Sequence, residues 1–139
     1  MIDSNTVMAL DVGQKRIGIS TANLVTKIAS PLTTISVDGT ELNIIEQLIK
    51  EHEVQTLVVG MPRGLEGQET SQTEKTRKFA QELQGLGYEV HLQDEALTSV
   101  KAKEELNQRK KPYSKHEVDS LAATYILEDF LRDHYETQA

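Results

Sequence analysis

The sequence predicts an α/β fold with one mixed five-stranded sheet that is flanked by helices. Three segments rich in apolar and β-branched residues, at 7–11, 15–22 and 26–37, open the chain and are typical of a strand meander. Two further apolar strand segments, at 55–60 and 88–92, alternate with helical segments, as in parallel sheets. The predicted order is therefore β-β-β-α-β-α-β-α-α, in which the later strands run parallel to the first.

The first half of the chain contains the predicted meander and one helix. The first two strands are joined by the segment DVGQKRIG, whose glycines are typical of a tight hairpin. A helix is predicted over 40–51, with Asp38 or Thr40 as its N-cap. Its apolar residues recur at helical spacing: Leu42, Ile45, Leu48 and Ile49.

The second half continues with strands and helices in alternation. Gly60-Met61-Pro62 ends the apolar strand QTLVVG, and the capping-box pattern Ser71-x-x-Glu74 is predicted to open the next helix. That helix is expected to end at Gly87. Its apolar stripe is Phe79, Leu83 and Leu86.

After the last predicted strand we expect two more helices. The first covers 98–109, and Pro112 breaks the chain after it. A second capping box, Ser114-x-x-Glu117, opens the long final helix. The apolar face of that helix is Val118, Leu121, Ala122, Tyr125 and Ile126.

Composition and charge limit the classes of function. The 139 residues, 37% of them hydrophobic, suit a single domain over 1–139, and the lack of cysteine excludes disulfides and thiolate metal sites. We expect a cytoplasmic protein, because the chain has no apolar run of membrane-spanning length and its first residues lack a signal-peptide pattern. The net charge of −7 argues against a non-specific polyanion binder.

Three carboxylates occupy positions where a site is expected. Asp11 ends the first strand, Asp94-Glu95 follow the last one, and Asp119 lies in the second turn of the final helix. Because sites in open sheets form at the carboxyl ends of the strands, Asp11, Glu95 and Asp119 are predicted to converge. Such a group needs a hard cation, and Mg²⁺ or Mn²⁺ fits oxygen ligands. The alternative is that the three are separate capping or surface groups, with Glu95 at a helix N-terminus.

Basic residues near these positions indicate contacts with nucleic acid. Lys15 and Arg16 follow Asp11, and Arg63 lies in the glycine-rich loop GMPRGLEGQETSQT. The segment RKKPYSKH carries Lys110 and Lys111, with a tyrosine available for stacking. We expect these cations to border the carboxylates on one face, and the alternative is solvated loops. The four histidines are interpreted as scattered surface or strand residues.

Four segments of the chain resemble the YqgF family. They are ALDVGQKRIGIS, VVGMPRGLEGQE, QDEALTS and VDSLAATYIL, which span positions 9–128 in order. The family's members are predicted RuvC-type Holliday junction resolvases, also described as pre-16S rRNA nucleases. The resemblance implies a ribonuclease H-like fold and catalytic, metal-binding carboxylates at Asp11, Glu95 and Asp119. The family's third motif has arginine where this chain has Ala96, which puts one phosphate contact in doubt.

The resemblance implies a Mg²⁺- or Mn²⁺-dependent nuclease that hydrolyses phosphodiester bonds, in 5′-end processing of precursor 16S ribosomal RNA. One alternative is a Holliday junction resolvase, which would cut four-way DNA as a symmetric homodimer rather than act as a monomer. Another is a noncatalytic RNA-binding factor in ribosome assembly. A phosphate-binding ATPase of the actin and sugar-kinase type also uses an Asp-x-Gly hairpin, but it needs two such domains. Precursor rRNA and branched DNA are therefore the expected partners.

Overall fold

The computed structural model describes residues 5–64, 66–95 and 98–136, and the predicted order of elements is confirmed there. The strands are β1 (Thr6–Val12), β2 (Arg16–Asn23), β3 (Ile28–Ser36), β4 (Val54–Met61) and β5 (Glu89–Asp94). The helices are α1 (Glu41–Glu51), α2 (Ser71–Gly85), α3 (Thr98–Gln108) and α4 (Lys115–Leu131), which continues into a π-helical turn, η1 (Arg132–Glu136). No helix in these three ranges has the length and apolar character needed to cross a membrane.

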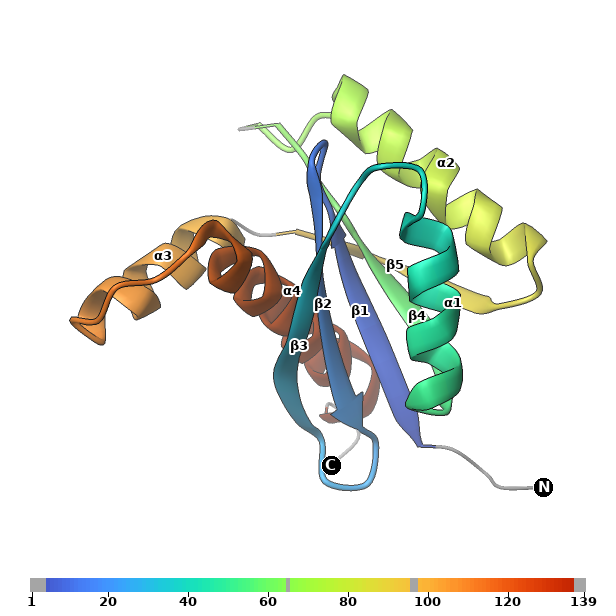
Figure 1. Ribbon diagram of the computed structural model, residues 1–139, viewed down its shortest axis with the longest axis horizontal. Helices are drawn as coiled ribbons and strands as arrows, with labels where there is room; N and C mark the ends of the chain where they lie inside the picture. Colours follow the sequence, from blue (N-terminus) through green and yellow to red (C-terminus); the bar gives the residue numbers. More distant parts are fainter. Residues whose placement is uncertain (1–4, 65, 96–97, 137–139) are drawn as a thin grey trace.

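The five strands form one mixed sheet in the order β3-β2-β1-β4-β5. The meander is antiparallel, whereas β4 runs parallel to β1 and β5 runs parallel to β4. This arrangement confirms the predicted mixed sheet, and it places the carboxyl ends of β1, β4 and β5 at one edge (Figure 1).

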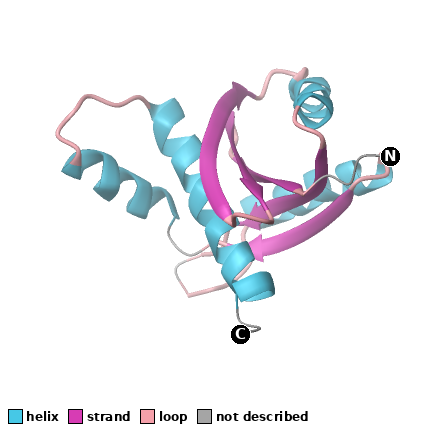
Figure 2. Cartoon of the chain, turned by 90° about the horizontal axis from the view of Figure 1, so that it is seen from below, coloured by secondary structure: helices cyan, strands magenta, loops and turns pink. Residues whose placement is uncertain are grey.

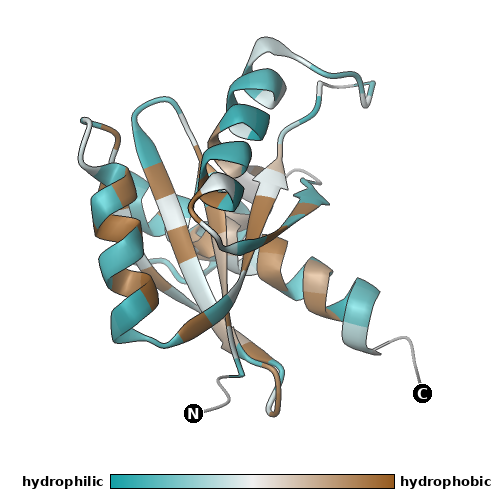
Figure 3. Cartoon of the chain, turned by 90° about the vertical axis from the view of Figure 1, so that its right-hand side faces the viewer, coloured by the Kyte–Doolittle hydropathy of each residue, from teal (hydrophilic) through white to brown (hydrophobic). Residues whose placement is uncertain are grey.

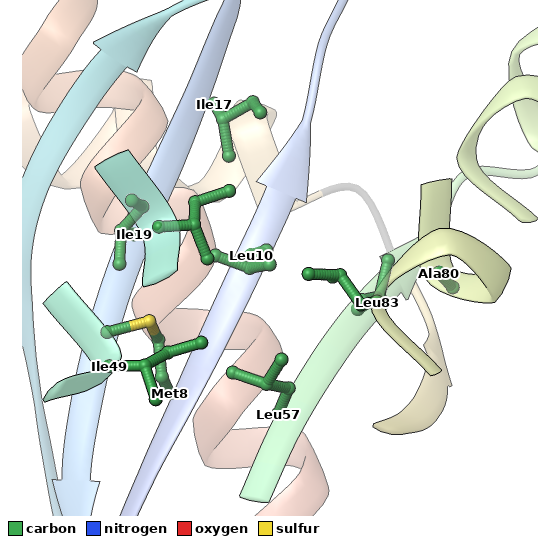
Figure 4. Packing of buried hydrophobic residues seen from close by; sticks show 10 residues of the cluster. Met8, Leu10, Ile17, Ile19, Ile49, Leu57, Ala80 and Leu83 are labelled. Atoms are coloured by element: carbon green, nitrogen blue, oxygen red, sulfur yellow. The ribbon is translucent and has the colours of Figure 1, made fainter. Parts of the chain in front are cut away.

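Helices cover both faces of the sheet. Helices α1 and α2 pack on one face, and α4 packs on the other, with α3 outside it (Figures 1 and 2). The two faces follow from the period-two alternation of side chains along β1, because Met8 and Leu10 join the core under α1 and α2 while Val7 and Ala9 join the core under α4. Figure 4 shows the first of these cores, in which Leu10, Leu57 and Leu83 come from β1, β4 and α2.

Hydropathy follows the same layers. On the ribbon, apolar residues are concentrated along the strands, whereas the loops and the outer surfaces of the helices are largely hydrophilic (Figure 3). The predicted stripe of α2 was wrong at Leu86, which is 53% exposed, whereas Ala80 and Leu83 are buried. The helix ends at Gly85, so the helical spacing no longer applies at Leu86.

The start of α2 differs by one residue from the prediction. Thr70 is the N-cap, and its hydroxyl accepts a hydrogen bond from the Thr73 backbone N–H while the Thr73 hydroxyl accepts one from the Thr70 N–H. The predicted pair Ser71 and Glu74 is therefore wrong, because Ser71 is already the first helical residue. The second predicted box, Ser114 with Glu117, is confirmed at the start of α4.

We expect Thr70→Ala to lower the free energy of unfolding by about 1 kcal/mol, because it leaves the Thr73 N–H without its cap. Ser71→Ala is the matched control, and it should change stability by only a few tenths of a kcal/mol. Urea unfolding measures both. Equal losses in the two variants would contradict the cap assignment.

Of the two residues predicted to cap α1, Thr40 is confirmed as the N-cap, and Asp38 lies two residues before it. Thr40 is the N-cap residue, yet its side chain makes no capping bond to the helix. The Asp38 carboxylate instead accepts hydrogen bonds from the backbone N–H and the hydroxyl of Thr40, and these bonds lower the pKa of Asp38. The Glu41 carboxylate accepts from the N–H groups of Asp38 and Gly39, which fixes the loop that enters the helix.

Candidate active site

Asp11 lies at the carboxyl end of β1, on the face of the sheet that α4 covers. The alternation that sends Val7 and Ala9 to this face sends Asp11 there too. Its cross-strand partner on β2 is Gly18. On the other side, Leu10 pairs with Val59, so Gly60 is the next residue of the neighbouring strand β4. The aspartate thus has a glycine on each adjoining strand.

The glycine on β2 allows the backbone of α4 to lie directly on the sheet. A Cβ atom at Gly18 would lie 2.0 Å from the backbone oxygen of Asp119, which no real contact permits. One turn further along the helix, the Ser20 hydroxyl donates a hydrogen bond of 2.8 Å to the Ala123 carbonyl oxygen. These contacts fix Asp119 beside Asp11.

The glycine on β4 makes room for Glu95. The backbone N–H of Glu95 donates to the Met61 carbonyl oxygen at 3.0 Å, which continues the β4–β5 pairing beyond the end of β5. A Cβ atom at Gly60 would lie 3.1 Å from Cγ of Glu95. Glu95 therefore lies over β4, next to Asp11.

The electrostatics of Asp11 show that the three carboxylates are close together. Its pKa is raised well above the ordinary 3.8, first because burial removes the carboxylate from water and then because of the negative charge of Glu95. A hydrogen bond with Glu95 and the charge of Asp119 raise it further. The structure thus brings together the three carboxylates that the sequence singles out.

The three carboxylates have the right chemistry for a hard divalent cation, but they are not arranged as a complete coordination site. Asp11, Glu95 and Asp119 supply only oxygen donors, the ligands that Mg²⁺ and Mn²⁺ prefer, and their mutual repulsion favours a cation among them. Among the described residues, however, no three acidic or imidazole groups are arranged as a ready-made metal site. Asp119 instead accepts a hydrogen bond of 2.5 Å from Nε of Arg16.

Comparison with known proteins decides the family. A family model described as "RuvX: Holliday junction resolvase" matches residues 5–133. The chain belongs to this RuvX family. A protein of Escherichia coli K12 named "Putative pre-16S rRNA nuclease" is 39% identical over 137 residues, which cover 95% of this chain and 99% of that protein. A second one, from Escherichia coli O9:H4, matches to the same extent. RuvX proteins are nucleases, so the chain belongs to a nuclease family.

Solved structures show the same fold. RuvC of Thermus thermophilus in complex with a Holliday junction has a TM-score of 0.58 at 15% identity, over 94% of this chain and 96% of that one. The fowlpox virus resolvase with its Holliday junction DNA has a TM-score of 0.53 at 11% identity, over 92% and 97% of the two chains. The predicted ribonuclease H-like fold is confirmed by these resolvases.

Both arginines that were predicted to contact nucleic acid are paired with carboxylates in this RuvX protein. Arg16 is paired with Asp119, as described above. Arg63 contacts Asp94 at 3.1 Å and Glu69 at 3.4 Å, so it bridges the end of β5 and the loop before α2. Lys15 is exposed and lines a pocket of about 310 Å³ with the rest of the β1–β2 loop, Arg16 and Asp119.

Lys110 and Lys111 do not line either of the two pockets beside Asp119. They follow α3 directly, and the loop then returns from the outer end of α3 to the start of α4 (Figures 1 and 2). The end of α3 that precedes these lysines points away from the sheet, so the expected positive face that they would border stays a prediction (Figures 1 and 2). Their role in binding nucleic acid remains a prediction. Ala96 lies outside the described residues.

The structure also shows groups that sequence reasoning missed. Lys103 of α3 lies in a pocket beside Asp119. The sequence does contain a signal for this position. Ala102 and Leu106 are spaced to form the side of α3 that packs on α4, and Lys103 lies next to that side. The histidines are not all scattered, since His91 of β5 and His134 of η1 have ring centroids 6.2 Å apart, beside Phe130.

Proposed function

We propose that this protein is a Mg²⁺- or Mn²⁺-dependent nuclease that processes the 5′ end of precursor 16S ribosomal RNA. The observation that carries the proposal is the convergence of Asp11, Glu95 and Asp119 at the carboxyl end of β1. The names of the relatives that are 39% identical to the chain support the substrate.

Each residue of the site has a proposed task. Asp11, Glu95 and Asp119 would hold the cation, which in hydrolytic sites makes water a better nucleophile and neutralises charge on the phosphate. Lys15 of the β1–β2 loop and Arg16, the first residue of β2, would bind the phosphates of the substrate strand. Arg63 would hold the β4–α2 loop against Asp94 at the end of β5, and so keep the chain next to Glu95 in place.

The test is cleavage of two labelled substrates by the purified protein with Mg²⁺ or Mn²⁺. One is a precursor 16S rRNA 5′ segment and the other a four-way DNA junction. Metal-dependent cleavage of the RNA at its mature 5′ end, absent in Asp11→Asn, would support the proposal. Preferential cleavage of the junction would overturn the choice of substrate.

Junction resolution is the second candidate, since the description of the matching family names this activity. A resolvase makes paired cuts as a symmetric dimer. Paired nicks at the junction, made by a protein that sediments as a homodimer, would favour it. Binding of both substrates without cleavage of either would instead favour the noncatalytic assembly factor.

We expect Arg16→Gln to strengthen Mn²⁺ binding, because the substitution frees Asp119 from its ion pair and removes a positive charge beside the site. A partly exposed ion pair contributes about 0.2–1 kcal/mol, so the dissociation constant should fall by up to about fivefold. Isothermal calorimetry measures it, with Lys15→Gln as the control, since Lys15 precedes Arg16 directly and lines the same pocket but forms no ion pair with Asp119. Weaker Mn²⁺ binding in Arg16→Gln than in Lys15→Gln would contradict this prediction.

A further inference from the structure

A second pocket adjoins the carboxylate site, between α3 and the start of α4. It has a volume of about 410 Å³, and Arg16 and Asp119 line both this pocket and the one at the β1–β2 loop. The two pockets therefore adjoin at one ion pair. The other main lining residues are Lys103, Tyr113, Lys115 and Val118.

The lining combines positive charge with an aromatic ring. Lys103 and Lys115 have no ion-pair partner among the described residues, and the carboxylate of Asp119 is already paired with Arg16. The pocket thus has excess positive charge although the protein carries a net charge of −7. Its volume lies at the lower end of the range for small-molecule sites, which suits a single nucleotide.

The pocket is held in shape by contacts between its walls. The Tyr113 hydroxyl donates to Oδ1 of Asn107 at 2.8 Å, which ties the loop to the end of α3. The Tyr125 hydroxyl of α4 donates to the Glu105 carboxylate of α3 at 2.7 Å, and burial together with this carboxylate raises the pKa of Tyr125 to about 12. Apolar residues pack the two helices together beneath these bonds: Ala102, Leu106, Val118, Leu121 and Ala122.

We propose that this pocket holds one unpaired nucleotide of the RNA strand, next to the phosphate that is cut. The base stacks on the ring of Tyr113, and its phosphate lies between Lys103 and Lys115. Stacking requires a free base face, which a base inside a duplex does not offer. This inference rests on the proposed nuclease function, and it gives the site a preference for a single-stranded segment beside the cut.

The first test measures the contribution of Lys103. All variants are made in the Asp11→Asn background, so that binding of a labelled single-stranded RNA is followed by fluorescence anisotropy without cleavage. We expect Lys103→Gln to weaken binding about 3- to 10-fold and to reduce the slope of log affinity against log salt by about 0.7. The matched control is Lys101→Gln, an exposed lysine of the same helix that does not line the pocket. Equal effects of the two substitutions would overturn the proposal.

The second test measures stacking on Tyr113. Tyr113→Leu should weaken binding of the single strand roughly 5- to 100-fold, whereas Tyr113→Phe, which keeps the ring and loses only the bond to Asn107, should weaken it far less. Binding of a fully paired RNA duplex should be insensitive to Tyr113→Leu. An equal loss of binding in Tyr113→Phe and Tyr113→Leu, or an equal loss for the duplex, would overturn the stacked nucleotide.

The experiments distinguish failure of the nucleotide pocket from failure of the proposed nuclease function. If the wild-type protein cleaves neither substrate but Lys103→Gln and Tyr113→Leu still weaken binding relative to their controls, the pocket is established and the nuclease proposal fails. If the protein cleaves RNA and both variants bind as their controls do, the nuclease stands and the nucleotide pocket is overturned.

Discussion

Asp11→Asn is expected to abolish metal-dependent cleavage and, in the absence of metal, to stabilise the fold. Loss of a catalytic carboxylate should lower the cleavage rate by roughly 10³- to 10⁴-fold. The gain in stability has a separate cause. The carboxylate of Asp11 is half-buried beside Glu95 and Asp119, and an amide of the same shape carries no charge for these groups to repel.

The stability difference should depend on pH with a defined sign. The folded protein holds the Asp11 proton more tightly than the unfolded chain, because the pKa of Asp11 is raised in the fold. Stability from this group is therefore present below about pH 3.8, the ordinary value, and is lost as the pH rises through the raised pKa. The melting temperature of Asp11→Asn should exceed that of the wild type most at pH values above the raised pKa of Asp11, and the two should approach each other in acid.

Divalent metal should reverse the order of stability. A cation that binds only the folded state stabilises it, so saturating Mn²⁺ should raise the melting temperature of the wild type and have little effect on Asp11→Asn. Differential scanning calorimetry with Mn²⁺ and with a chelator measures this. A metal-free Asp11→Asn protein that is less stable than the wild type at pH 7 would show that Asp11 has a structural role, and would contradict the assignment of a repelled carboxylate.

Much of the site could be predicted from the sequence because its residues lie at the ends of locally recognisable elements. Asp11 follows an apolar strand, and Asp119 has a fixed offset from the capping box at Ser114. A parallel sheet brings such strand ends to one edge, which places Glu95 as well. Local sequence patterns, with the rule that the ends of parallel strands meet at one edge of the sheet, were therefore enough to predict that these three carboxylates converge.

The contacts of the site could not be predicted because they depend on packing between distant elements. Arg16 and Asp119 are 103 positions apart, and their ion pair requires the position of α4 on β2. Lys103 reaches the site only because α3 folds back along α4, and the same geometry carries Lys110 outward. A basic segment can be recognised in the sequence, but the sequence does not show in which direction the helix before that segment points.

Gly18→Ala is expected to be the most damaging single substitution for stability. Its Cβ would lie 2.0 Å from the backbone oxygen of Asp119, 2.3 Å from the carbonyl carbon and 2.9 Å from the Ser120 nitrogen. These are backbone atoms of α4, so no side-chain rotation can relieve the clash, and the helix must move away from β2. We expect a loss of about 3 kcal/mol or more, measured by urea unfolding.

The same substitution tests whether α4 positions the active site. A shift of Asp119 by about 1 Å should lower metal-dependent cleavage about 100-fold in the protein that still folds. Gly85→Ala is the matched control, since nothing lies within 4 Å of its added methyl group at the end of α2, and it should be neutral or stabilise the fold by up to about 1 kcal/mol. If Gly18→Ala were as stable and active as Gly85→Ala, the backbone of α4 would not lie against β2 at Asp119. The convergence of the three carboxylates depends on this contact, because Asp11 and Glu95 are positioned by the sheet whereas Asp119 is positioned only by the helix packed on it.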